Sequence, residues 1–314
     1  MHSKHPVWCA ALLAAFAIVT SSAAAPKVAV ILKGRTAFWK AVEKGATDAG
    51  ARLGAEIVVK APLADTDVAV QIQLLNAVAA QGTPAIVIAP INKEALTAPI
   101  AAAVAKGVKV VAIDTPLGGT TTPVFVGTDQ EGSGRAAGAL LAKLVGDTQE
   151  AALLKHNQSS GATLDRERGA AEAFRAAHPQ GVLHADIYAS AEPGQEESQC
   201  ALLLTTHPQV AAILSTGSPG TFAMLHVIQQ QKLGGKVKLI GFGFNLNREI
   251  AAAIGHDEMQ GWIAQLPTEV GARGVEAALA LLKGERVPAV VHTDYLVVTK
   301  DNLSDPKVQA LLAE

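Results

Sequence analysis

Short apolar runs alternate along the chain with longer segments in which apolar residues recur at helical spacing. Runs such as 27–33 and 108–113 are almost wholly apolar, which is typical of parallel strands covered by helices on both faces. Thr36 is positioned to cap the first helical segment, and Gly107 follows the last helical position of another. The first set of expected strands is 27–33, 55–59, 85–89 and 108–113, with helices at 36–53, 65–80 and 94–106.

The same alternation then repeats. Expected strands lie at 151–154, 182–189, 210–214 and 237–241, and expected helices at 164–177, 195–206, 222–231 and 247–255. Strands that alternate with helices of this length indicate right-handed crossovers and parallel sheets. Two successive sets predict an α/β fold with two doubly wound parallel-sheet lobes.

Three segments are expected to join these lobes as extended crossings: 123–128, 262–265 and part of 290–298. No Ser/Gly/Pro-rich linker is present, so the crossings predict a three-segment hinge. The expected division is an N-terminal lobe of 25–127 plus 266–292 and a C-terminal lobe of 128–265 plus 293–314.

The N-terminus has the pattern of a secretory signal peptide. Lys4 precedes an apolar run over 7–19, and small residues follow up to Ala25. Because Pro26 disfavours a cut directly before it, cleavage after Ala24 is expected, with residues 1–24 removed and the mature chain in the periplasm. An uncleaved anchor is less favoured, since the apolar run is short for a membrane span.

Composition narrows the function. The net charge is -2 and basic residues do not cluster, which argues against a nucleic-acid partner. Cys9 lies in the signal segment, so Cys200 is expected as a single buried thiol without a disulfide. Histidines do not cluster at metal spacing and no nucleophile or phosphate-loop motif is present, so neither a metal, a cofactor nor an enzymatic activity is expected.

Ligands of parallel sheets bind beyond the carboxyl ends of the strands. The expected site therefore draws on polar and aromatic residues after the strands, including Lys33 and Arg35 in one lobe and His156 and Asn157 in the other. Whether these four face the site stays open from the sequence.

Several stretches, in order, resemble one family: Phe38-Trp39, 110–114, 166–169, 206–210, 240–242 and 263–267. With them the chain resembles the type I periplasmic binding proteins of sugar ABC transporters, close to the ribose-binding group. This resemblance implies a monomer that captures a monosaccharide or related compound by hinge closure and delivers it to an inner-membrane ABC permease.

The resemblance also implies residue roles. Phe38 and Trp39 match an aromatic pair that stacks on the sugar ring, and Asp114 matches a carboxylate that accepts from hydroxyls. Arg168 matches an arginine that donates from the other lobe, with Arg166 interpreted as a surface charge. Gln265 matches a hinge glutamine that reaches the ligand.

Other positions depart from the family pattern. Thr36-Ala37 replaces Asn-Pro, Gly217-Ser218 replaces Asn-Asp, and Gly243 replaces the Asp of Gly-Phe-Asp. A plain ribose site is therefore altered, and the ligand is expected to be less hydroxylated, or partly anionic if Lys33 or Arg35 faces it. The complete set of expected binding residues is Arg35, Thr36, Phe38, Trp39, Asp114, Thr115, Arg168, Ser218, Asn245 and Gln265.

Competing functions share this fold. A periplasmic sensor protein would present its closed form to a chemoreceptor or sensor kinase. A LacI-type repressor would need a helix-turn-helix where this chain has an export signal, and a periplasmic enzyme is disfavoured by the missing motifs. The solute-binding component of an ABC importer is the preferred hypothesis.

Overall fold

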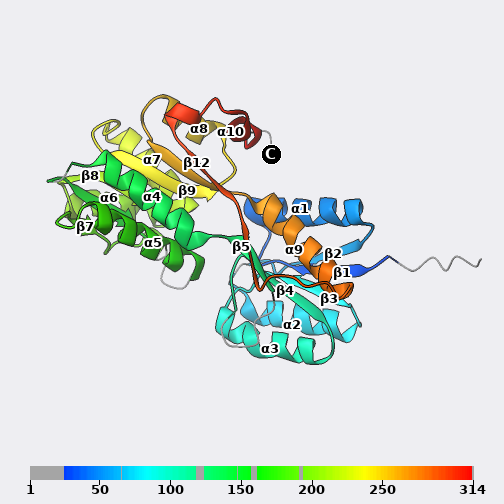
Figure 1. The fold of residues 1–314 in the computed structure, drawn as a ribbon. Helices are drawn as coiled ribbons and strands as arrows, with labels where there is room; N and C mark the ends of the chain where they lie inside the picture. Colours follow the sequence, from blue (N-terminus) through cyan, green and yellow to red (C-terminus); the bar gives the residue numbers. More distant parts are fainter. Residues whose placement is uncertain are drawn as a thin grey trace, which may run out of the picture.

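The computed structural model describes residues 25–64, 66–117, 124–146, 148–156, 161–190 and 194–312. The expected signal segment 1–24 lies outside them. Two six-stranded sheets with helices on both faces form two lobes (Figure 1). The prediction of two doubly wound α/β lobes is confirmed.

The first lobe has a wholly parallel sheet in which alternate residues face different helices. Val28 and Val30 of its inner strand pack toward α1 and α9, whereas Ala29 and Ile31 pack toward α2 and α3. Apolar residues on both faces explain the continuous apolar run. Across the sheet the strands are β11 (Val290–Thr293), β5 (Val124–Thr128), β4 (Lys109–Ile113), β3 (Ala85–Ile88), β1 (Lys27–Ile31) and β2 (Glu56–Lys60). The helices are α1 (Ala37–Leu53), α2 (Val68–Ala80), α3 (Lys93–Ala105) and α9 (Pro267–Leu282).

The second lobe repeats this plan, with one antiparallel edge strand. Its strands, in order, are β12 (Tyr295–Val298), β10 (Gly261–Gln265), β9 (Lys238–Phe244), β8 (Val210–Ser215), β6 (Glu150–Leu154) and β7 (Leu183–His184), with β12 antiparallel to β10. The helices α4 (Gln130–Leu144) and α5 (Gly161–Ala177) cover one face. The other face packs against α6 (Glu196–Thr206), α7 (Ser218–Gln230) and α8 (Arg248–Gly255), and η1 (Lys300–Asn302) and α10 (Pro306–Ala310) follow β12.

Within the described ranges the chain passes between the sheets three times: from β5 to α4, from β10 to α9 and from β11 to β12. The Thr128 and Thr293 hydroxyl oxygens lie 3.4 Å apart where two of these passages run side by side. The segments expected as crossings, 123–128, 262–265 and 290–298, do lead into these passages, but their described residues are also strands: β5 and β10 lie inside their sheets and β11 and β12 at the edges. Their sheet neighbours come from distant parts of the sequence, which local patterns do not reveal.

Two smaller expectations are also decided. Cys200 is fully buried inside α6, and burial raises the pKa of its thiol to about 12, which confirms a packing role. Thr36 precedes α1 in extended conformation, but its side chain makes no capping hydrogen bond, so that prediction was wrong. Among the described residues, no helix has the length and apolar character needed to cross a membrane.

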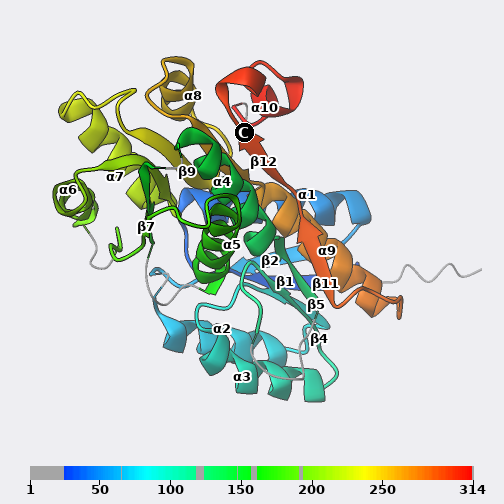
Figure 2. The same cartoon turned by 60° about the vertical axis from the view of Figure 1, so that its left-hand side comes forward.

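Each lobe contains one pair of closely packed helices, α1 with α9 and α4 with α5 (Figures 1 and 2). In α9, a Cβ atom at Gly271 would collide with the backbone carbonyl of Val42 in α1. Glycine at this position therefore sets the distance between the two helices.

Gly271→Ala should destabilise the protein by about 2 kcal/mol, because the added methyl group must push α1 away from α9. The melting temperature should fall by about 5 °C in a thermal unfolding experiment. Gly255→Ala is the matched control, since the nearest atom to its added Cβ is 3.9 Å away. Equal melting temperatures for the two variants would contradict close packing at Gly271.

Candidate functional site

The carboxyl ends of β1 and β4 place an ion pair on the first lobe. The Lys33 ammonium donates to Asp114 Oδ2 at 2.6 Å and to Thr115 Oγ1 at 2.7 Å. Both Lys33 and Asp114 are largely shielded from solvent, with side chains 18% and 13% exposed. Asp114 has a positive φ of 63°, a conformation that Asp tolerates and that is common at functional sites. Lys33 therefore faces the site, which the sequence left open.

Aromatic rings stand beside this ion pair. Phe38 and Trp39, at the start of α1, pack edge to face with ring centroids 4.9 Å apart. Trp39 is a core residue, and the Lys33 ammonium lies 5.5 Å from its ring centroid. Phe38 is half-buried and meets Phe244 of the second lobe at 5.5 Å, so an aromatic contact bridges the lobes.

The second lobe contributes a buried arginine, Arg166 in α5, which is 3% exposed. Its guanidinium donates to Gln130 Oε1 and to the Thr216 carbonyl, and lies 4.2 Å over the Phe242 ring. Burial lowers the pKa of Arg166 to about 10, and the Asp114 carboxylate of the other lobe acts in the opposite direction. The Arg166 and Asp114 side chains, on different lobes, therefore lie close enough to interact electrostatically.

Arg168, which the sequence assigned to the ligand, lies elsewhere. It is exposed and pairs with Glu131 and Asp165 on the surface of the second lobe. The structure exchanges the expected positions of the two arginines, with Arg166 buried and Arg168 exposed, because positions two apart on a helix face opposite sides. The sequence does contain a sign of this burial: small or apolar residues recur every fourth position around the arginine. Ala162, Arg166, Ala170 and Phe174 form one buried face of α5.

Gln130, which the sequence analysis also missed, connects Arg166 with the hinge. It is the first residue of α4 and is buried. Its amide group accepts from Arg166 and donates to Gln265 Oε1 at 3.0 Å. Gln265 ends β10 and in turn donates to the Gly243 carbonyl at 3.4 Å. One hydrogen-bonded row thus joins the arginine to two chain passages between the lobes.

Neutral polar groups complete the second lobe's side. Asn245 follows β9 with a φ of 49°, and its carbonyl accepts from Trp262 Nε1 at 2.7 Å. Ser218 begins α7, and its oxygen lies 2.9 Å from where a Cβ of Gly243 would stand. Such a Cβ would also collide with the Trp262 ring, which explains glycine at this strand end.

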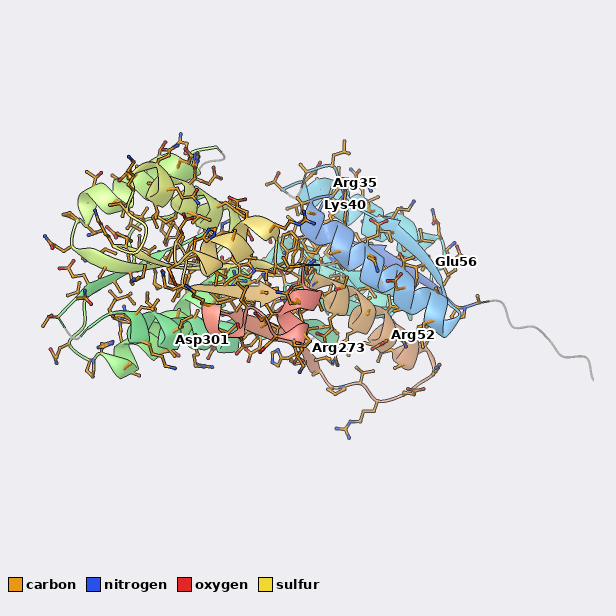
Figure 3. All side chains as sticks on the ribbon, turned by 90° about the horizontal axis from the view of Figure 1, so that it is seen from above. Arg35, Lys40, Arg52, Glu56, Arg273 and Asp301 are labelled. Atoms are coloured by element: carbon orange, nitrogen blue, oxygen red, sulfur yellow. The ribbon has the colours of Figure 1, made fainter. Side chains whose placement is uncertain are left out.

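The remaining expected residues contribute less. Arg35 and Thr36 are exposed before α1, and Figure 3 shows Arg35 near Lys40 at the end of α1 that borders the other lobe. His156 is half-buried at the end of β6, whereas Asn157 lies outside the described residues.

Glu167 is a buried carboxyl next to Arg166. It accepts from the His156 backbone amide at 3.2 Å and from the Thr216 hydroxyl at 2.9 Å. Burial raises the pKa of Glu167, although both hydrogen bonds and the nearby cations counteract this effect. The carboxyl fixes the strand ends behind Arg166.

A cavity of about 400 Å³ lies between the lobes, beside Asp114. It is lined by the starts of α4 and α5 and by β5, and includes Gln130 and Thr128. Over the described ranges, no group of three or more His, Cys, Asp or Glu side chains could hold a metal ion. The arrangement can bind a small polar molecule between opposed charged, aromatic and amide groups.

Two parallel-sheet lobes whose strand ends face each other, joined by three chain passages, define the type I periplasmic binding protein fold. A profile of the periplasmic binding protein domain family matches residues 28–286, and the chain belongs to this family.

The chain is similar to several characterised proteins. It is 27% identical to the ribose import binding protein of Escherichia coli over 84% of this chain and 86% of that protein. Identity to the D-allose-binding periplasmic protein of Escherichia coli is 25%, over 95% and 100% of the two chains. A carbohydrate transporter solute-binding protein from Agrobacterium radiobacter, solved with D-arabinose, superposes with a TM-score of 0.81 at 29% identity, covering 93% and 100% of the chains.

Gln130→Leu should lower the free energy of unfolding by about 2 kcal/mol, because the buried Arg166 guanidinium loses its side-chain acceptor. Urea denaturation measures this change. Gln229→Leu is the control: Gln229 is exposed and bonds only Glu258, so a change within about 0.5 kcal/mol is expected. Equal losses in both variants would contradict the connecting role of Gln130.

Glu167→Gln should flatten the pH dependence of stability while keeping an acceptor oxygen. The folded pKa of Glu167 lies above that of the unfolded chain, so its contribution is present below the unfolded value and is lost as pH rises through the folded value. The variant should therefore lose less stability than the parent as pH rises from about 4.5 toward neutrality. Urea midpoints across this range, with the exposed Glu172→Gln as control, measure the difference. Parallel curves for parent and Glu167→Gln would contradict it.

Proposed function

We propose that this protein is the solute-binding component of an ABC importer and that it captures a sugar or sugar-like polar molecule between its lobes. The observation that carries the proposal is the electrostatic pairing of Asp114, after β4 of one lobe, with Arg166, in α5 of the other, together with the aromatic pair Phe38 and Trp39. The names of the relatives in Escherichia coli, which refer to ribose and D-allose, support the ligand class.

The chemistry of the groups suits a polyhydroxylated ligand. A carboxylate accepts from neighbouring hydroxyls and a guanidinium donates to two oxygens, and such charge-assisted hydrogen bonds are the stronger kind. Phe38 offers an apolar ring edge or face for the C–H side of a sugar. Gln265, Ser218 and Asn245 supply neutral donors and acceptors that fix orientation.

Closure of the lobes about the three passages is the proposed mechanism. A ligand that touches Asp114 on one lobe and Arg166 on the other binds the closed form better than the open form, and so shifts the population toward closure. The lobes in this proposal are 25–127 plus 266–292 and 128–265 plus 293–314, with the hydrogen-bonded Gln130 and Gln265 at the hinge.

The cellular setting follows from the family. We propose export with removal of residues 1–24, action as a monomer in the periplasm, and delivery of the ligand to an inner-membrane permease. The relatives are binding proteins and no catalytic step is proposed.

Asp114→Asn tests the site with little change in shape, because Asn also tolerates a positive φ. At least one sugar from a panel with D-ribose, D-allose and D-arabinose, together with sugar acids, should raise the melting temperature of the parent protein. Titration calorimetry should then show about tenfold weaker binding for the variant, as expected for the loss of a charged hydrogen bond.

Asp48→Asn is the control, since Asp48 is exposed on α1 and pairs only with Lys44. If no member of the panel raised the melting temperature, the proposed function would be wrong. If Asp114→Asn bound the ligand as tightly as the parent, the assignment of Asp114 would fail.

A further inference from the structure

The two cations of the interlobe site have different hydrogen-bond partners. Lys33 projects from the end of β1 and Arg166 from α5, and both act on the Asp114 carboxylate. In the described part of the chain, Asp114 is the carboxylate that accepts a hydrogen bond from either cation. Since Lys33 already occupies Asp114, this carboxylate does not compensate Arg166 by direct contact.

Arg166 is held by neutral acceptors. Its hydrogen bonds go to the Gln130 amide and to the Thr216 carbonyl, and the guanidinium has more N–H groups than these acceptors use. The nearby Glu167 turns its Oε1 to the His156 amide and the Thr216 hydroxyl instead. A buried cation without a bound anion is costly, so an anionic group that reaches Arg166 would be strongly favoured.

The facing strand ends of the second lobe leave no room for a further carboxylate. At Gly243 the Trp262 ring fills the space of any side chain, and Ser218, Asn245 and Gln265 are neutral. Of the acidic groups at the cavity rim, Glu131 and Asp165 are paired with arginines and Asp129 caps α4 at 2.8 Å. Among the described groups of the site, Lys33 and Arg166 keep N–H groups that these contacts do not use, and Asn245 Oδ1 is a buried acceptor without a partner.

We propose that the ligand carries a carboxylate, as in an aldonic or uronic acid, and that Lys33 and Arg166 bind this carboxylate from opposite lobes. This inference rests on the proposed function and narrows its ligand class. The Lys33 ammonium keeps an N–H beyond those used by Asp114 and Thr115. The Arg166 fork matches the paired oxygens of a carboxylate. Closure of the lobes would then bring the two cations onto one anion.

Matched pairs of ligands test the proposal on the full mature protein by titration calorimetry. The pairs are D-galactose with D-galacturonate, D-glucose with D-gluconate, and D-arabinose with D-arabinonate. At least one acid should bind at least about tenfold more tightly than its neutral partner. Added salt should weaken the binding of the acid more than the binding of the neutral sugar.

Lys33→Gln should reduce the affinity for the acid about tenfold and change that for the neutral sugar much less. Lys40→Gln is the control, because Lys40 is exposed on α1 and its loss changes the net charge equally. Lys33→Arg keeps the charge and should retain the preference for the acid over the neutral sugar. This variant keeps the proposal testable if Lys33→Gln fails to fold.

The outcomes separate the two proposals. Binding of neutral sugars with no preference for any acid overturns the carboxylate inference and leaves the proposed function standing. An acid preference that survives Lys33→Gln unchanged overturns the role of Lys33. Failure of every sugar and acid to bind overturns the proposed function, and this inference with it.

Discussion

A guanidinium held away from water between two sheets is the constraint on which the interlobe site depends. Arg166 carries its charge at any neutral pH, even with its pKa lowered to about 10 by burial. A buried charge must be surrounded by acceptors, and Gln130 and the Thr216 carbonyl meet this need. Gln130 must therefore stand at the start of α4, and Thr216 at the end of β8. The hinge residue Gln265 is in turn fixed by Gln130.

This arrangement ties ligand chemistry to the passages between the lobes. Arg166 interacts electrostatically with Asp114 across the lobes, and through Gln130 and Gln265 it also contacts the segments that must bend on closure. A ligand group that draws the guanidinium forward would act on the same hydrogen bonds that hold the hinge. Behind these segments, α1 packs on α9 and α4 packs on α5 through close contacts at glycines.

The sequence predicts the fold well for a physical reason. Parallel strands buried on both faces give apolar runs that a single sequence reveals, as at 27–31 and 109–113, and helices between them follow. Non-local pairing is what the local pattern misses: it predicts the crossings after β5 and β10 but not that both segments pair inside sheets. The candidate site likewise contains residues that local patterns predict and residues that they do not. Asp114, Phe38 and Gln265 stand at predicted strand or helix ends and are found there.

Arg166 and Lys33 show where local reasoning ends. The sequence left the orientation of Lys33 open and placed Arg166 at the surface, and only the burial of one α5 face shows that Arg166 points inward. Gly243 carries a similar lesson about compensation between distant positions. The Trp262 ring fills the space that any side chain at Gly243 would occupy. Lys33 donates to Asp114 and Thr115, whereas Arg166 donates only to the neutral Gln130 and Thr216 among the described residues, with the Asp114 and Glu167 carboxylates nearby. A ligand that supplies its own negative charge would give Arg166 a hydrogen-bonded anion in place of neutral acceptors alone.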